Sequence, residues 1–198
     1  VIQSAGTVAL KNGMTLETLF GQLDAIKSQV NIPLVLMGYL NVIMHYGYER
    51  FCQRCVECGV SGFIIPDLPF DDYLNEIKPL ADRYNLRCIM MITPETSEER
   101  IRFIDRNTDG FIYMVSSASI TGAQQNFDEA KQQYFQRINA MNLHNPRMIG
   151  FGISNRQTLE SAQNNAAGAI IGSKFVTLLR NTGNADEALN QLLEDLKK

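Results

Sequence analysis

The sequence has no apolar run long enough to cross a bilayer, and its first residues form no signal-peptide pattern. Its 18 Lys and Arg residues are scattered, and the formal net charge is −3. Proteins that bind nucleic acid or anionic membranes carry clustered basic residues, so neither partner is expected. The chain starts at Val1, without an initiator Met and in mid-pattern. We therefore expect that residues precede Val1 in the intact protein.

Several catalytic and nucleotide-binding motifs are also missing. Neither G-x-G-x-x-G nor G-K-[ST] occurs, which excludes the common dinucleotide and P-loop sites. The only two histidines, His45 and His144, have no nucleophile or acid paired with them in a recognisable motif. The sequence therefore predicts no Ser/His/Asp triad and no metal site.

Cysteine is scarce, but three of the four cysteines, Cys52, Cys55 and Cys58, follow C-x-x-C-x-x-C spacing. Such spacing can hold a metal ion or an iron–sulfur cluster. These cysteines, however, fall in a segment that is typical of a helix, and a regular helix would spread the three side chains over a broad arc. We expect them, and Cys88, to be small apolar side chains of a reduced, cytosolic protein.

The 198 residues suit a single domain over 1–198, and 45% hydrophobic residues suffice for a core. Six short apolar runs recur along the chain, and they are nearly continuous rather than alternating. This pattern is typical of parallel strands that are buried on both faces. The predicted strands are Pro33–Gly38, Gly62–Pro66, Leu86–Met91, Phe111–Val115, Arg147–Gly150 and Ala169–Gly172.

Amphipathic helices are predicted between these strands, as parallel crossover connections require. Apolar residues recur at helical spacing over Met14–Gln29 and Asn126–Met141, and again from Ala185 to the end of the chain. Two capping boxes, at residues 96–99 and 154–157, predict helices that run through Asn107 and Asn165. The α/β pattern fits a doubly wound sheet or part of a (β/α)8 barrel, and periodicity alone does not separate the two.

Glycines stand where the last strands turn into loops. Gly150-Phe151-Gly152 follows one predicted strand and leads into a helix, and Gly172-Ser173 follows the next. Glycine lets a phosphate approach backbone N–H groups closely, and a helix N-terminus adds unpaired donors. Two successive loops of this kind match the phosphate site after strands 7 and 8 of TIM barrels, although tight turns alone could also explain the glycines.

Three further side chains are candidates by position. Asp67 ends a predicted strand, where a barrel has its active-site face, but it could equally be an Asp that caps a loop. Tyr39 and Tyr113 lie at or near strand ends, where a phenol can line a pocket or belong to the core.

Several segments together resemble one family, the tryptophan synthase alpha chain. They occur in the family's order and cover nearly the whole chain: VIQSA at the start, PLVLMGYLN, GVSGFIIPDLP, GFIYMVSSASITGA, GFGIS and GAIIGSKFV. The resemblance implies a (β/α)8 TIM barrel from which about two N-terminal strands are absent. It implies a lyase that cleaves indole-3-glycerol phosphate to indole and glyceraldehyde 3-phosphate in tryptophan biosynthesis.

The resemblance also implies roles for individual residues. Gly122, Gly152, Gly172 and Ser173 would hold the phosphate. Thr121 would belong to a mobile loop that closes over the substrate, and the pocket would be lined by Phe151, Tyr39, Tyr113 and Ile170. Asp67 would lie close to the site without being the acid or the base.

The same resemblance implies that no catalytic residue lies within 1–198. The family uses a Glu at the end of its second strand and an Asp in the following loop, and both positions precede Val1. The residues from Val1 to Lys198 alone are therefore expected to be inactive. The implied assembly is a cytoplasmic α2β2 heterotetramer in which the beta chain, not this chain, carries pyridoxal phosphate.

Two other functions fit the same residues. A sugar-phosphate isomerase or epimerase with a phosphate-binding TIM barrel would leave indole-3-glycerol phosphate intact. A non-catalytic subunit would keep the phosphate glycines, lack the upstream acid, and only activate a partner synthase.

Overall fold

The structure is a computed structural model that describes residues 1–116, 129–150 and 152–197. The described residues divide into two compact units. Unit 1 comprises Val1–Val8, Met91–Arg106 and Phe111–Lys198, and unit 2 comprises Ala9–Met90 and Asn107–Gly110. The organisation of 1–198 as one domain stays a prediction.

The six predicted strands are all present, and every pairing described within a unit is parallel. Unit 2 contains β1 (Leu34–Met37), β2 (Val60–Ile64) and most of β3 (Arg87–Ile92), with β2 between the other two. Unit 1 contains β4 (Ile112–Val115), β5 (Arg147–Gly150) and β6 (Gly168–Ile170), with β5 in the middle. The α/β class and the parallel strands were thus predicted correctly, although β2 begins two residues earlier than expected because Val60 already pairs with Leu34.

Burial on both faces was wrong for the first strand. In β1 the side chains of Val35 and Met37 are 38% and 54% exposed, although both are apolar. Within the described residues of unit 2, β1 pairs with β2 on one edge and with no strand on the other, which explains the exposure. The strands β2 and β4, in contrast, are almost entirely buried.

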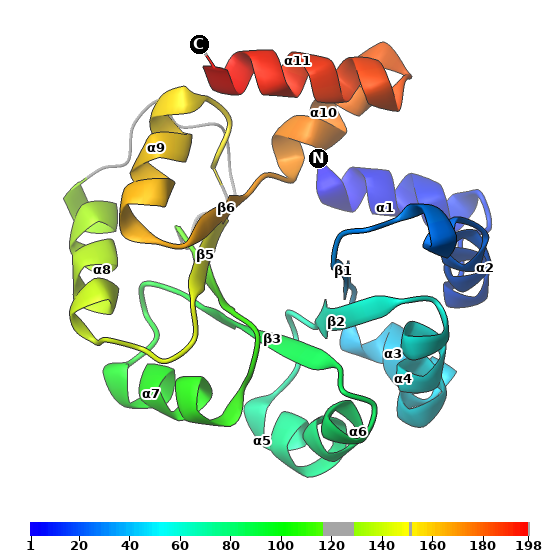
Figure 1. Cartoon of the computed structure of the whole chain (residues 1–198), viewed down its shortest axis with the longest axis horizontal. Helices are drawn as coiled ribbons and strands as arrows, with labels where there is room; N and C mark the ends of the chain where they lie inside the picture. Colours follow the sequence, from blue (N-terminus) through cyan, green and yellow to red (C-terminus); the bar gives the residue numbers. More distant parts are fainter. Residues whose placement is uncertain (117–128, 151, 198) are drawn as a thin grey trace. The chain divides into compact units, whose positions relative to one another are not determined.

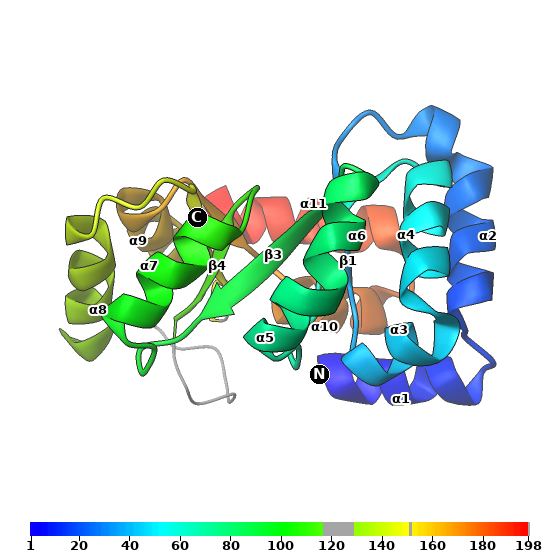
Figure 2. The same ribbon diagram turned by 90° about the horizontal axis from the view of Figure 1, so that it is seen from below.

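Unit 2 is built on a row of aromatic rings. Phe20, Phe51 and Phe63 are each at most 2% exposed, and the ring centroids are 5.9 Å apart for Phe20–Phe51 and 5.4 Å for Phe51–Phe63. These rings join α2, α4 and β2, and α2 lies beside α4 in Figures 1 and 2. The helical elements of unit 2 are α2 (Leu16–Ile26), the 3-10 turn Lys27–Gln29, α3 (Leu40–Tyr46), α4 (Tyr48–Glu57), α5 (Phe70–Asp72), the π-helical turn Tyr73–Ile77 and α6 (Lys78–Arg83).

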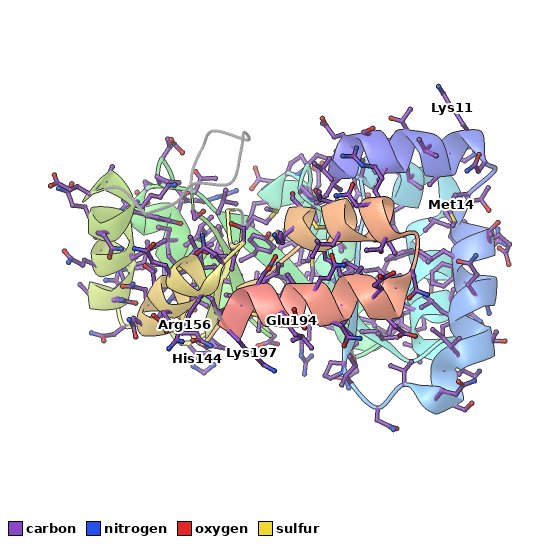
Figure 3. All side chains as sticks on the ribbon, turned by 90° about the horizontal axis from the view of Figure 1, so that it is seen from above. Lys11, Met14, His144, Arg156, Glu194 and Lys197 are labelled. Carbon is purple, nitrogen blue, oxygen red and sulfur yellow. The ribbon has the colours of Figure 1, made fainter. Side chains whose placement is uncertain are left out.

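In unit 1 the helices pack in sequence order around the strands. Helix α8 contacts α9, α9 contacts β6, and α10 lies along α11 (Figures 1 and 3). Their bounds are α7 (Glu98–Asn107), α8 (Glu129–Ala140), α9 (Arg156–Asn165), α10 (Ser173–Thr182) and α11 (Ala185–Lys197). The remaining helix, α1 (Ile2–Lys11), has no buried residue.

Both predicted capping boxes were wrong by one residue. Helix α7 is capped by Ser97, whose Oγ accepts from Arg100 N, because Thr96 instead bonds to Thr93 within the preceding turn. Helix α9 is capped by Asn155, whose side chain accepts from Thr158 N while the Thr158 side chain accepts from Asn155 N. The reciprocal pair that defines the box is therefore Asn155 and Thr158.

The cysteines lie in an apolar environment. All four are free and buried, and Cys58 Sγ donates to Phe20 O at 3.4 Å. Burial raises the pKa of Cys52 to about 11 and that of Cys88 to about 12, so their thiolates are disfavoured at neutral pH. Among the described residues, no three His, Cys, Asp or Glu side chains are grouped as a metal ion would require.

No helix in the described part of the chain combines the length and the apolar character that a membrane crossing needs.

Candidate functional site

The carboxyl ends of β4, β5 and β6 lie at one level in unit 1. Val115 pairs with Gly150, and Gly150 pairs with Ile170, so these three residues form one row across the strands. Adjacent strands are about 4.8 Å apart, and the loops that follow these residues therefore start side by side. A ligand at this edge can contact more than one loop.

Gly152 and Gly172 occupy equivalent places beyond that row. Each lies two residues after a paired strand end, Gly152 after Gly150 and Gly172 after Ile170. Gly152 has φ of +84°, a left-handed conformation that L side chains rarely adopt. The loops that carry Gly152 and Gly172 thus start from neighbouring strand ends, and Ile170 is half-buried at the end of β6. That Gly152, Gly172 and Ser173 hold a phosphate stays a prediction.

The N-terminus of α10 supplies backbone donors at this edge. The helix starts at Ser173, and its first backbone hydrogen bond into the helix runs from Val176 N to Gly172 O at 3.1 Å. The N–H groups of Ser173, Lys174 and Phe175 precede that bond and therefore have no acceptor within the helix. Gly172 makes no side-chain cap, so these donors and the helix dipole can receive an anion.

Tyr113 lies directly against Gly150. A Cβ built at position 150 would come within 2.1 Å of Tyr113 Oη, so glycine alone fits beside this ring. The ring is 5% exposed, and burial raises the pKa of its phenol to about 12. A phenol in this environment stays protonated at neutral pH and can donate a hydrogen bond.

Sequence reasoning missed two contacts at this edge. In the sequence, Gly150 stands out only as the first glycine of the Gly150-Phe151-Gly152 motif. That motif is the one signal that could have indicated its contact with Tyr113. The sequence gives Ile2 no role. In the structure, a Cβ added at Gly172 would lie 3.3 Å from Ile2 Cδ1. Nothing in the sequence pattern predicts that Ile2 lies next to Gly172.

Tyr39 and Asp67 lie in unit 2, at the carboxyl ends of β1 and β2. Asp67 Oδ1 accepts a hydrogen bond of 2.9 Å from Leu40 N, and Gly38 N donates to Ile64 O. Asp67 therefore caps the N-terminus of α3 from the neighbouring loop, which is the loop-capping role considered from the sequence. Tyr39 is the residue before α3, and its side chain is 54% exposed.

The other candidate site residues, Thr121, Gly122 and Phe151, lie outside the described residues.

Comparison with known protein families gives a match over the whole chain. The family model described as "Tryptophan synthase alpha chain" matches residues 1–198. The chain belongs to the tryptophan synthase alpha chain family.

Individual members of the family are closely similar. The tryptophan synthase alpha chain of Parabacteroides distasonis is 64% identical over 198 residues, which are 100% of this chain and 77% of that protein. The alpha chain of Phocaeicola vulgatus is 65% identical with the same coverage.

Solved structures agree. The tryptophan synthase A-subunit of the hyperthermophile Pyrococcus furiosus superposes with a TM-score of 0.88 at 29% identity, covering 98% of this chain and 78% of that one. The tryptophan synthase alpha subunit of Campylobacter jejuni gives 0.85 at 29%, covering 98% and 77%. The fold class is thus the TIM-barrel α/β fold of the tryptophan synthase alpha chain, and the doubly wound alternative is excluded.

Membership also fixes the class of chemistry. Tryptophan synthase alpha chains are lyases of tryptophan biosynthesis, and this chain covers 77% of the length of its close relatives. The alpha chain uses no cofactor, since the pyridoxal phosphate of tryptophan synthase belongs to the beta chain.

Proposed function

We propose that the intact protein cleaves indole-3-glycerol phosphate to indole and glyceraldehyde 3-phosphate and passes indole to a tryptophan synthase beta chain in a cytoplasmic α2β2 complex. The observation that carries the proposal is the family match over all 198 residues together with relatives that are 64% and 65% identical. The edge formed by β4, β5 and β6 offers donors of the kind that a phosphoryl group needs.

The phosphoryl group of the substrate binds at this edge. The backbone N–H groups at Gly152, Gly172 and Ser173 donate to it, the Ser173 hydroxyl adds a further donor, and Gly122 contributes a fourth backbone group. The N-terminus of α10 favours the negative charge. This grip fixes the non-reacting end of the substrate and so orients the bond to be cleaved.

The indole end is surrounded by apolar side chains. Tyr113, Ile170 and Phe151 line the pocket, and Thr121 belongs to the segment that closes over the substrate and excludes water. For Tyr39, which lies in the other unit, the pocket role rests on the family resemblance alone. Asp67 holds the loop after β1 by accepting a hydrogen bond from Leu40 N, and it is neither the acid nor the base. Neither the acid that protonates the indole ring carbon nor the base that takes the hydroxyl proton is assigned to residues 1–198.

Cleavage is tested with the full-length protein as its gene encodes it. The protein is mixed with indole-3-glycerol phosphate, and indole and glyceraldehyde 3-phosphate are measured by chromatography. Equal amounts of both products are expected, at a higher rate when a beta chain is added. An isomerase or epimerase would leave the substrate intact, and a non-catalytic activator would release no indole while raising the activity of the beta chain; either result would exclude the proposal.

A further inference from the structure

An ion pair lies beside the N-terminus of α10. Lys174 is the second residue of this helix, and its Nζ lies 2.6 Å from Oδ2 of Asp195 on α11. The two side chains are 28% and 36% exposed, so the pair is only partly shielded from solvent. Both helices belong to unit 1 and pack along each other (Figure 3).

Both partners stand at the unfavourable ends of their helices. A cation in the first turn of α10 opposes the helix dipole, and an anion in the last turn of α11 does the same. A partly exposed ion pair stabilises a protein little. The packing of α11 against α10 therefore does not by itself explain why both charges lie at helix ends that disfavour them. The carboxyl end of α11 already receives a cation, since Arg156 Nη1 donates to Lys197 O at 3.2 Å (Figure 3).

Lys174 has a second neighbour of opposite charge if a phosphoryl group binds at α10. Its backbone N–H belongs to the first turn that faces the proposed site, so we take its ammonium to lie within about one Debye length, roughly 10 Å at 0.1 M salt, of an anion bound there. Asp195 offsets the Lys174 charge at 2.6 Å. The net field at the site therefore depends on both residues.

We propose that Lys174 and Asp195 set the affinity of the phosphate site, with Lys174 attracting the phosphoryl group and Asp195 attenuating that attraction. This inference rests on the proposed function, because it takes the phosphoryl group to bind at the start of α10. The two residues thus act with opposite signs on the binding of any phosphorylated ligand, although neither needs to contact it.

Glycerol 3-phosphate is the probe, titrated calorimetrically into the full-length protein at low ionic strength. Lys174→Ala leaves the Asp195 charge unopposed, and we expect binding to weaken about two- to fivefold. Asp195→Asn frees the lysine and is expected to tighten binding by a similar factor. The double variant restores a neutral pair and is expected to bind nearly as the wild type does.

A high salt concentration and a control variant separate the electrostatic effect of each substitution on the affinity from a structural effect. In 0.5 M sodium chloride the differences should largely disappear, because screening shortens the reach of both charges. Arg180→Ala removes a cation from the last turn of the same helix, about 9 Å further along it, and should weaken binding clearly less than Lys174→Ala does. Thermal unfolding of each variant reports any loss of α11 packing.

The outcomes distinguish the two proposals. If Asp195→Asn weakens binding, or if both single variants lower the melting temperature and the affinity together, the pair is merely structural and the inference is wrong. If the affinities do not change, it is also wrong. If the wild-type protein binds no glycerol 3-phosphate, the proposed function fails first, and the inference fails with it.

Discussion

The Tyr113 ring occupies the space that any side chain at position 150 would need. In Gly150→Ala the new Cβ would displace this buried ring, and overpacking of this kind costs about 1–3 kcal/mol of folding free energy. We also expect weaker substrate binding, because Tyr113 is proposed to line the pocket. Urea unfolding and the KM for indole-3-glycerol phosphate measure the two effects.

Gly21→Ala is the matched control for this substitution. A Cβ at Gly21 has no neighbour within 4 Å, and the residue lies inside α2, where alanine is favoured over glycine. A slight gain in stability and an unchanged KM are expected. If Gly150→Ala behaves as Gly21→Ala does, the protein lacks the close contact with Tyr113.

A buried carboxylate gives a prediction about pH. Burial of Asp105 favours its protonated form, but hydrogen bonds from the backbone N–H groups of Asn145 and His144 and from the Asn145 side chain outweigh burial and lower the Asp105 pKa. Because the folded-state pKa lies below the ordinary value of 3.8, the carboxylate stabilises the fold above about that pH. That stabilisation is lost as the pH falls through the lower, folded-state pKa.

Asp105→Asn should therefore destabilise the protein at pH 7, by about 1–3 kcal/mol, because the backbone N–H groups of His144 and Asn145 lose a charged acceptor. The difference from the wild type should shrink as the pH is lowered below about 4. Denaturant unfolding at pH 7 and pH 3 measures both quantities. A difference that stays constant over this interval would show that Asp105 is not preferentially ionised in the folded state.

Among the secondary-structure elements, α3 depends on a cap from another loop. Asp67 Oδ1 bonds to Leu40 N, while Tyr39, the residue before the helix, makes no side-chain cap. Asp67→Ala should cost about 1 kcal/mol of stability, as loss of a helix cap does, and Asp67→Asn should cost less because the amide oxygen still accepts. Thermal unfolding of the two variants tests this order, and equal losses would show that the carboxylate charge matters rather than the cap.

The strands and most helices were predictable because their apolar patterns are local. Continuous apolar runs marked β2 and β4 as buried parallel strands, and the glycines after β5 and β6 indicated the edge where loops gather. Cap positions were not predictable, since Thr96 and Ser154 match the capping-box motif better than the observed caps Ser97 and Asn155 do. Which residue caps depends on the turn before the helix, where Thr96 is already bonded to Thr93.

At the scale of the whole molecule, contacts between residues far apart in the sequence could not be predicted from the sequence. Three such pairs join segments whose local sequence patterns give no information about the partner segment. They are Tyr113 with Gly150, Lys174 with Asp195, and Ile2 with Gly172. The exposure of Val35 and Met37 likewise depends on which strands flank β1, not on its own apolar sequence. Family membership, in contrast, followed from short motifs in a fixed order, and the match over residues 1–198 confirms it.

The most direct test of the proposed phosphate grip is a crystal structure of the full-length protein with indole-3-glycerol phosphate bound. We predict that the phosphoryl oxygens lie about 3 Å from the backbone nitrogens of Gly152, Gly172 and Ser173. The indole ring should then lie beside Tyr113. A phosphoryl group bound away from the start of α10, with those nitrogens facing only solvent, would contradict the account.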